Sequence, residues 1–232
     1  MPDIAIEAVD GGSFSAYLAR PASPNGSGVV AIQEIFGVNK VMRDICDELA
    51  ADGYLAICPD LFWRQEPGIQ LNTYDEVEWA RAFELFGGFD QDKAVGDIVA
   101  TLAALRRTGG FSGKAGAVGY CLGGRMAYLT ACRTDIDAAV GYYGVGIDGL
   151  LDEASNIKAP LVLHIAEEDG FVDKDAQARM HTGLDGNPKV TLYDYAGVDH
   201  AFAREGGEHY DTAAAKLAND RTAAFFRTQL VG

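Results

Sequence analysis

The segment GYCLGG, residues 119–124, constrains the fold of this chain more than any other stretch. It follows an apolar, strand-like run over 115–118 and precedes an Ala-, Met- and Leu-rich helical stretch over 125–132. Strand, sharp turn and helix in this order would place Cys121 on a strained turn, with glycines where a Cβ would collide with backbone. The N–H groups and positive dipole end of the helix would favour its thiolate. A buried structural cysteine is the alternative interpretation.

Elsewhere, short apolar runs alternate with amphipathic stretches of helical period. Strands are predicted over 4–9, 14–19, 29–32, 54–58, 115–118, 138–143, 160–166 and 189–195, and helices over 41–53, 74–86, 90–107, 125–132, 173–184 and 208–230. The first two strands flank an Asp-Gly-Gly turn and predict a hairpin. The alternation predicts a single α/β domain over 1–232, with a mostly parallel sheet, helices on both faces and a ligand crevice at the carboxyl ends of the strands.

The formal net charge of −15 argues against binding to nucleic acid or to anionic membranes, because both reward clustered Lys and Arg. A small anionic ligand would need a local cationic site. The four cysteines show no metal-ligand spacing, so neither a metal site nor a disulfide framework is expected, and Cys46, Cys58 and Cys132 are interpreted as small core residues. The amino terminus lacks the features of a signal peptide, and no run is apolar enough to span a membrane, so we expect a cytoplasmic protein.

Polar residues that follow predicted strands are candidates for catalysis, because the carboxyl ends of parallel strands meet at one edge. A thiol nucleophile at Cys121 needs a base, and the base needs an acid that orients it. Asp169 and His200 follow two later strands, and the order nucleophile, acid, histidine is that of α/β-hydrolases. The other histidines fall within a predicted strand, at His164, or on predicted helices, at His181 and His209.

Two other aspartates compete with Asp169 for the acid role. Asp173 looks like the N-cap of the helix that follows it. Asp199 precedes His200 directly, and the side chains of neighbouring residues diverge. We therefore prefer Asp169.

Glu34 ends the strand that supplies the second oxyanion N–H in α/β-hydrolases. This position assigns the backbone N–H groups of Ile35 and Leu122 to an oxyanion hole and turns the Glu34 carboxylate toward the thiol. A solvated loop acid is the alternative interpretation of Glu34.

Four motifs together carry a resemblance that spans nearly the whole chain. They are QEIFGVN (33–39), GYCLGG (119–124), GYYGVG (141–146) and HAFAR (200–204). With them the chain resembles the dienelactone hydrolase (carboxymethylenebutenolidase) family of the α/β-hydrolase superfamily, whose members act in the degradation of aromatic compounds without a cofactor. The resemblance implies that Cys121, Asp169 and His200 form a catalytic triad and that Glu34 takes the thiol proton once substrate binds.

The resemblance also implies that Arg204 binds a substrate carboxylate and that Phe36 and Tyr143 line the pocket. The predicted helix over 74–86 is a further candidate for the pocket wall, and here the chain departs from the family. Members that hydrolyse dienelactone carry a second carboxylate-binding arginine where this chain has Trp79. Arg81 is two residues on, roughly 200° around a helix. Either Arg81 substitutes, or the pocket is less cationic and the substrate differs.

These observations predict a cysteine hydrolase with an α/β-hydrolase fold that opens the lactone ring of dienelactone, through a thioester, to give maleylacetate. Its partner would be a small ester or lactone, anionic by the resemblance, and the protein would be a monomer or a small homo-oligomer. Hydrolysis of other small esters is the alternative that Trp79 favours. A redox sensor based on Cys121 is a third reading, for which Cys132 would be a badly placed resolving thiol.

Overall fold

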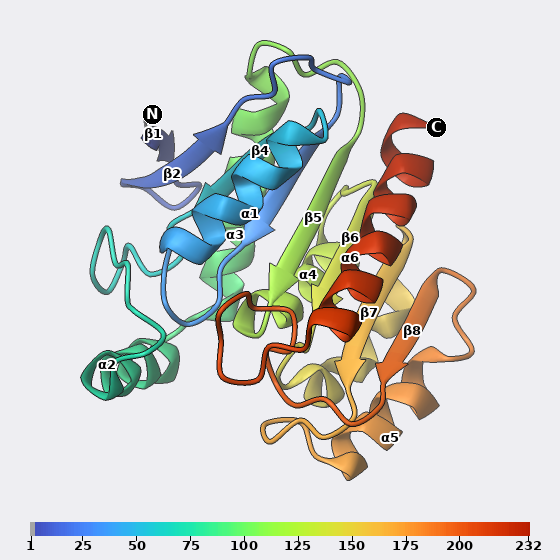
Figure 1. Cartoon of the computed structure of the whole chain (residues 1–232). Helices are drawn as coiled ribbons and strands as arrows, with labels where there is room; N and C mark the ends of the chain where they lie inside the picture. Colours follow the sequence, from blue (N-terminus) through green and yellow to red (C-terminus); the bar gives the residue numbers. More distant parts are fainter. Residues whose placement is uncertain (1–2) are drawn as a thin grey trace. The chain divides into compact units, whose positions relative to one another are not determined.

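A computed structural model describes residues 3–232 in two compact units (Figure 1). The first unit extends to Gly116 and the second runs from Ala117 to Leu230. The division falls within one strand, β5 (Ala115–Tyr120).

The first unit contains four strands, paired in the order β1-β2-β4-β3. They are β1 (Asp3–Glu7), β2 (Ser13–Ala19), β3 (Gly28–Ile32) and β4 (Leu55–Pro59). The β1–β2 pair is antiparallel, which confirms the predicted hairpin, and β3 runs parallel to β4. Every residue of β3 and β4 is buried, as their continuous apolar runs predict for strands covered on both faces.

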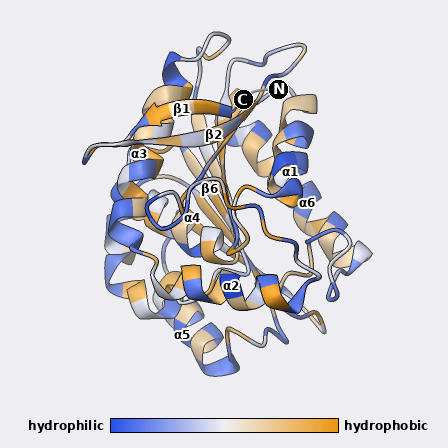
Figure 2. Cartoon of the chain, turned by 90° about the vertical axis from the view of Figure 1, so that its left-hand side faces the viewer, coloured by the Kyte–Doolittle hydropathy of each residue, from blue (hydrophilic) through white to orange (hydrophobic). Residues whose placement is uncertain are grey.

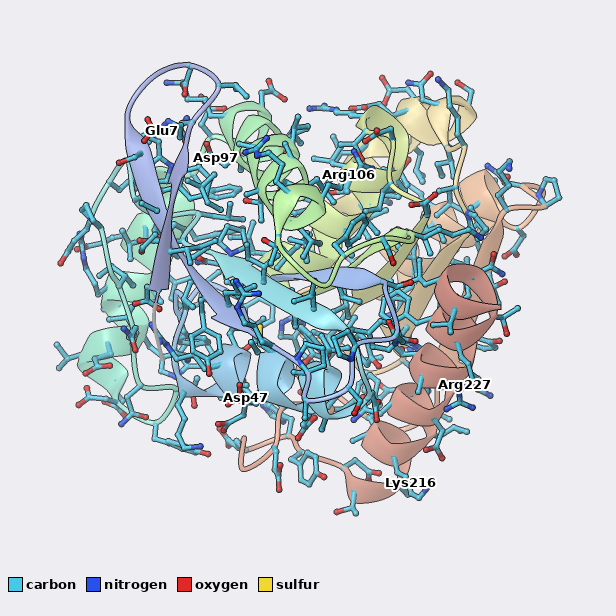
Figure 3. All side chains as sticks on the ribbon, turned by 90° about the horizontal axis from the view of Figure 1, so that it is seen from above. Glu7, Asp47, Asp97, Arg106, Lys216 and Arg227 are labelled. Atoms are coloured by element: carbon cyan, nitrogen blue, oxygen red, sulfur yellow. The ribbon has the colours of Figure 1, made fainter. Side chains whose placement is uncertain are left out.

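Helices α1 (Lys40–Ala51) and α3 (Gln91–Arg107) lie on opposite faces of these strands (Figures 1 and 3). Each begins at a side-chain cap, where Asn39 accepts the N–H of Met42 and Asp90 accepts two N–H groups of α3. Hydrophilic and hydrophobic segments alternate along α3 (Figure 2), and Asp47 marks the exposed face of α1 (Figure 3). Both helices are therefore amphipathic and pack their apolar faces against the sheet. A third helix, α2 (Glu76–Gly87), confirms the helix predicted over 74–86.

The second unit contains β5, β6 (Ala138–Tyr142), β7 (Leu161–Ala166) and β8 (Val190–Tyr195), in that order. The pairs β6–β7 and β7–β8 are parallel. Helices α4 (Leu122–Arg133) and α6 (Thr212–Phe226) lie on opposite faces, and α5 (Lys174–Leu184) connects β7 to β8 (Figure 1). Mostly parallel strands with helices on both faces confirm the predicted fold class.

Hydrogen-bonded side chains attach α6 to the strands that it covers. The hydroxyl of Thr222 lies 2.7 Å from that of Tyr142 and 2.9 Å from Nε2 of His164. The other ring nitrogen of His164 lies 2.7 Å from the hydroxyl of Tyr195, and Tyr142 donates to Asn219. This polar core satisfies groups that burial would otherwise penalise.

Two predictions about the second half were wrong. No helix or strand was predicted between the strands over 138–143 and 160–166, but a 3₁₀ helix spans Ile147–Asn156 there. The last helix begins at Thr212, because Asp211 caps it by accepting the N–H of Ala214, so His209 lies in a turn and not on a helix. Within residues 3–232, no helix is both long enough and apolar enough to cross a membrane.

Candidate active site

Cys121 sits between β5 and α4 in a backbone conformation that few residues other than glycine adopt. Its φ is 56° and its ψ is −115°. Its N–H donates to the carbonyl of Tyr142 at 3.0 Å, and its carbonyl accepts the N–H of Gly124 at 3.0 Å. Positive φ at a non-glycine residue is strained and persists only where its surroundings hold it. The predicted strained turn is therefore present, with Cys121 partly exposed on it.

The glycines on either side of Cys121 allow this turn to pack. A Cβ on Gly119 would lie 1.9 Å from the carbonyl oxygen of Gly123, and one on Gly124 would lie 2.5 Å from that of Tyr142. Neither contact can be relieved by moving a flexible side chain, because both partners are backbone atoms. These collisions are the ones that the sequence analysis expected for any residue larger than glycine at positions 119 and 124.

Asp169 and His200 come together from two adjacent loops. Nδ1 of His200 lies 2.9 Å from Oδ2 of Asp169, and both side chains are buried. Oδ1 of Asp169 also accepts the N–H groups of Phe171 and Val172, at 2.8 and 3.2 Å. Asp173, the rival acid, instead caps α5 by accepting the N–H of Ala176 at 2.8 Å. His200 therefore contacts Asp169, the aspartate that the sequence analysis preferred, while Asp173 is engaged at the start of α5.

The charge of His200 depends on its neighbours more than on its burial. Burial alone would lower the pKa of His200, but the adjacent Cys121 and the hydrogen bond with Asp169 outweigh it and raise the pKa to about 10. The side chains of His200 and Cys121 are also hydrogen-bonded. A sulfur, an imidazole and a carboxylate are therefore linked in the order that nucleophilic catalysis requires.

Tyr143 and Arg204 are two further predicted site residues of the second unit. Tyr143 has φ 38°, and its ring packs edge-on against His200, with centroids 5.1 Å apart. Arg204 is 7% exposed, and its Nε lies 3.1 Å from where a Cβ on Gly207 would be. A larger residue at position 207 would therefore disturb the guanidinium. Leu122 is the first residue of α4, so its N–H is one of the four that the helix itself cannot satisfy.

The first unit carries the other predicted site residues. Glu34 is 4% exposed, which excludes the solvated loop acid that the sequence left open, and Ile35 is 5% exposed. The backbone around Glu34 is held by Gln33, whose side chain donates to the carbonyl of Glu34 and accepts the N–H of Leu61. Phe36 is also buried, and its ring meets that of Trp79 edge-on at 4.8 Å.

Trp79 and Arg81 have different surroundings, although they lie two residues apart on α2. The indole of Trp79 donates to the carbonyl of Thr73 at 2.7 Å, and its ring centroid lies 5.7 Å from that of Phe83. Arg81 forms ion pairs with Glu66 at 2.6 Å and Glu84 at 2.7 Å, and its side chain is 40% exposed. Trp79 thus belongs to an aromatic cluster, whereas the charge of Arg81 is matched by two surface carboxylates.

Sequence reasoning overlooked the contacts of Asp199, which directly precedes His200. Asp199 was set aside because adjacent side chains diverge, yet its carboxylate accepts two backbone N–H groups, from Gly170 and from His200 itself. The signal that could have found it is the habit of Asp side chains in turns to bind nearby backbone N–H groups.

Comparison with known proteins agrees with the motifs. The family model "Dienelactone hydrolase family" matches residues 14–230. The "Putative carboxymethylenebutenolidase" of Azospirillum brasilense is 52% identical over 99% of this chain and 100% of its own length, and the "Carboxymethylenebutenolidase" of Pseudomonas putida is 39% identical over 96% and 94%. The crystal structure of "Putative Dienelactone Hydrolase" from Klebsiella pneumoniae has a TM-score of 0.82 at 30% identity and covers 97% of this chain and 99% of that one. The chain therefore belongs to the dienelactone hydrolase family, which is also what its four motifs indicated.

Proposed function

We propose that this hydrolase opens the lactone ring of dienelactone to give maleylacetate, with Cys121 as the nucleophile. The observation that carries the proposal is the linked set of Cys121, His200 and Asp169, with Cys121 on a strained turn at a helix N-terminus. An activated thiol beside an oriented imidazole is suited to acyl transfer. Family membership makes a lactone or ester the class of acyl donor.

In the first step the proton of Cys121 passes to Glu34 and the sulfur attacks the lactone carbonyl, so a carbon–sulfur bond forms. The ring carbon–oxygen bond then breaks, and the leaving enolate oxygen takes a proton from the His200 imidazolium, which gives the enol that tautomerises to maleylacetate after release. In the second step water attacks the thioester, His200 takes a proton from that water, and the thiolate leaves and takes back the proton from Glu34. The N–H of Leu122 at the start of α4 stabilises the developing oxyanion, and Ile35 is proposed for the second N–H.

We further propose that Arg204 binds the carboxylate of an anionic substrate and that Glu34 takes the thiol proton when substrate binds. Glu34 and Arg204 are both almost completely buried, at 4% and 7% exposure. Charged side chains are rarely buried to this extent unless they are paired or functional. Phe36, Tyr143 and Trp79 are proposed for the apolar parts of the pocket.

Hydrolysis of other small esters is the second candidate, and Trp79 favours it. The indole packs against Phe36 and Phe83, so this part of α2 offers an apolar surface and not a cation. The redox-sensor reading loses support from Cys132, which is buried. Burial raises the pKa of Cys132 to about 11, so it would rarely be the thiolate that a resolving cysteine must be.

A turnover assay with dienelactone beside a neutral aryl ester tests the proposal. Wild type should hydrolyse both, with the larger kcat/KM for dienelactone, and Cys121→Ala should hydrolyse neither while keeping the wild-type circular dichroism spectrum. Turnover of the aryl ester alone would favour the second candidate. Wild-type turnover by a folded Cys121→Ala variant would rule out covalent catalysis at this residue.

The charge of the substrate is tested by Arg204→Ala. This variant should weaken kcat/KM for carboxylate-bearing substrates by about 1.5 to 3 kcal/mol, the usual range for hydrogen bonds to charged groups, and affect neutral esters much less. Arg81→Ala is the matched control, because Glu66 and Glu84 already pair with that guanidinium. Equal losses for both substrate classes in Arg204→Ala would mean that Arg204 only supports the fold.

A further inference from the structure

The loops that carry Asp169 and His200 leave the sheet side by side. The ladder between β7 and β8 ends with the pair Ala166 and Tyr195. Two further backbone hydrogen bonds extend it into the loops, from the N–H of Glu167 to Tyr195 and from that of Glu168 to Val198, both at 3.0 Å. Beyond them the backbone ladder stops, and side chains must hold the two loops together.

The side chain of Asp199 makes the next connection between the loops. Its Oδ1 accepts the N–H of Gly170 at 2.9 Å and the N–H of His200 at 2.6 Å. The second contact is local, but Gly170 is 29 residues away in the chain and directly follows Asp169. One carboxylate oxygen therefore joins the backbone beside the acid to the backbone of the base.

We propose that Asp199 is a positioning residue, which keeps the Asp169 carboxylate and the His200 imidazole in hydrogen-bonding register by bridging their loops. The inference rests on the proposed function, since it concerns the residues that would serve as acid and base there. Asp199 needs no contact with substrate for this role.

The backbone that follows His200 explains why such a bridge is needed. Ala201 has φ 63°, a left-handed conformation that is unfavourable for a residue with a Cβ. A strained residue directly after the base would relax if its neighbours were free to move. The hydrogen bond from the His200 N–H to Asp199 is one of the contacts that prevent this.

The hydrogen bonds of Asp199 also help to hold the ring of Phe171 against the imidazole of His200. The ring of Phe171 packs edge-on against the imidazole of His200, with centroids 4.8 Å apart, although 52% of Phe171 is exposed. Its N–H donates to Asp169, and the preceding N–H, that of Gly170, donates to Asp199. Asp199 and Asp169 together therefore hold the segment that places Phe171 against the imidazole.

The carboxylate of Asp199 remains charged in its surroundings. Partial burial raises the pKa of Asp199, but the two backbone N–H groups and the nearby His209 and His200 outweigh it, so the pKa lies below its usual range. Nδ1 of His209 lies 3.7 Å from Oδ2 of Asp199. Hydrogen bonds to an ionised acceptor are roughly twice as strong as those between neutral groups, which suits a bridge across two loops.

The test compares Asp199→Ala with Asp199→Asn. The alanine variant loses both hydrogen bonds, and we expect kcat to fall about 10- to 100-fold with KM within about 2-fold, as for a small misplacement of catalytic groups. The asparagine variant keeps a neutral acceptor oxygen and should fall only about 3- to 10-fold. Asp173→Ala, which removes a carboxylate–N–H bond at the start of α5, is the matched control and should keep wild-type kcat.

A second readout separates positioning from a general loss of stability. Alkylation of Cys121 by iodoacetamide, followed against pH, reports the titration of the linked thiol and imidazole. Its midpoint should shift in Asp199→Ala and stay at the wild-type value in Asp173→Ala, even if both variants melt at a lower temperature.

Wild-type kcat and an unshifted alkylation midpoint in a folded Asp199→Ala variant would overturn the inference. If that variant does not fold, Asp199→Asn decides, and an unchanged kcat there has the same meaning. Absence of turnover in wild type would instead contradict the proposed function, while the alkylation profiles would still test the bridge.

Discussion

Two histidines of the second unit are buried almost equally but differ in charge. His164, in the polar core beneath α6, is 1% exposed, and His200, in the candidate active site, is 6% exposed. Burial lowers the pKa of His164 to about 3, with a smaller contribution from Arg221, whereas the pKa of His200 rises to about 10. The two ring nitrogens of His164 lie beside hydroxyl groups, on Tyr195 and Thr222, whereas the ring of His200 meets a carboxylate and a thiol. The partner and not the depth of burial therefore decides the charge of a buried imidazole in this protein.

Removing the Asp169 carboxylate beside His200 should bring the pKa of His200 closer to that of His164. In Asp169→Asn the ring loses its charged partner, so we expect the pKa of His200 to fall and kcat to drop on the order of 10⁴-fold, as for isosteric replacement of a triad aspartate. The pH dependence of kcat/KM and the kcat itself are the measurements. Asp173→Asn is the control, since asparagine also caps helices. A small loss of kcat with an unmoved pH profile would contradict the comparison.

The polar core should make the protein sensitive to acid. An unfolded histidine binds a proton near pH 6.5, whereas His164 stays neutral in the folded state down to about pH 3. The unfolded state thus binds more protons in this interval, and stability should fall by up to about 1.4 kcal/mol for each pH unit below 6.5, or about 4 kcal/mol over three units. Urea unfolding of wild type and His164→Gln between pH 6 and 4.5 measures this slope. Equal slopes in the two proteins would show that His164 becomes protonated in the folded state.

Removing one hydroxyl from the polar core should affect stability and leave turnover nearly unchanged. Thr222→Val removes one of two partners of the Tyr142 hydroxyl and leaves the buried Nε2 of His164 unsatisfied, so unfolding should become easier by about 1 to 3 kcal/mol. Thr228→Val, at an exposed site near the carboxyl end, is the control. Thermal melts and kcat report the two effects. A large loss of kcat would mean that the polar core also sets the active-site geometry.

Replacing a third histidine, His181, should change the stability of the protein least. His181 also meets carboxylates, those of Asp185 and Asp194, but its side chain is 33% exposed. Solvent and salt screen exposed ion pairs, so His181→Ala should change the free energy of unfolding by only about 0.2 to 1 kcal/mol, and less at high ionic strength. Urea unfolding at low and high salt measures this. A large change in the free energy of unfolding that does not depend on salt would mean that solvent does not weaken the ion pairs of His181 as we expect.

Local patterns were sufficient to predict most of the fold. The buried strands β3 and β4 and the hairpin β1–β2 follow from short-range hydrophobic spacing and turn residues. The close packing of Gly119 and Gly124 was predictable because the strained turn at Cys121 leaves no room for a Cβ beside it. The start of α6 was not, because helical patterning continues upstream of the cap at Asp211. The 3₁₀ helix before β7 has too short and irregular a period to be recognised.

In the candidate site, contacts between side chains could be predicted from the sequence, whereas contacts of side chains with backbone N–H groups could not. Asp169 and His200 were found from their places after strands, and their contact follows from the adjacency of β7 and β8. The two hydrogen bonds of Asp199 were missed because its partners are N–H groups, which every residue except proline carries and which sequence therefore does not distinguish. Likewise, the ion pair of Arg81 with Glu66 depends on how α2 meets the loop before it.

The positive φ of Cys121 limits which other side chains evolution or an engineer could install at this turn. A left-handed backbone is hardest for side chains branched at Cβ, whose second substituent crowds the neighbouring carbonyl. Threonine, although nucleophilic, is therefore a poor occupant of position 121. Serine has the same branching as cysteine and fits the same backbone. The turn thus favours an unbranched side chain at position 121, whether that side chain ends in sulfur or in oxygen.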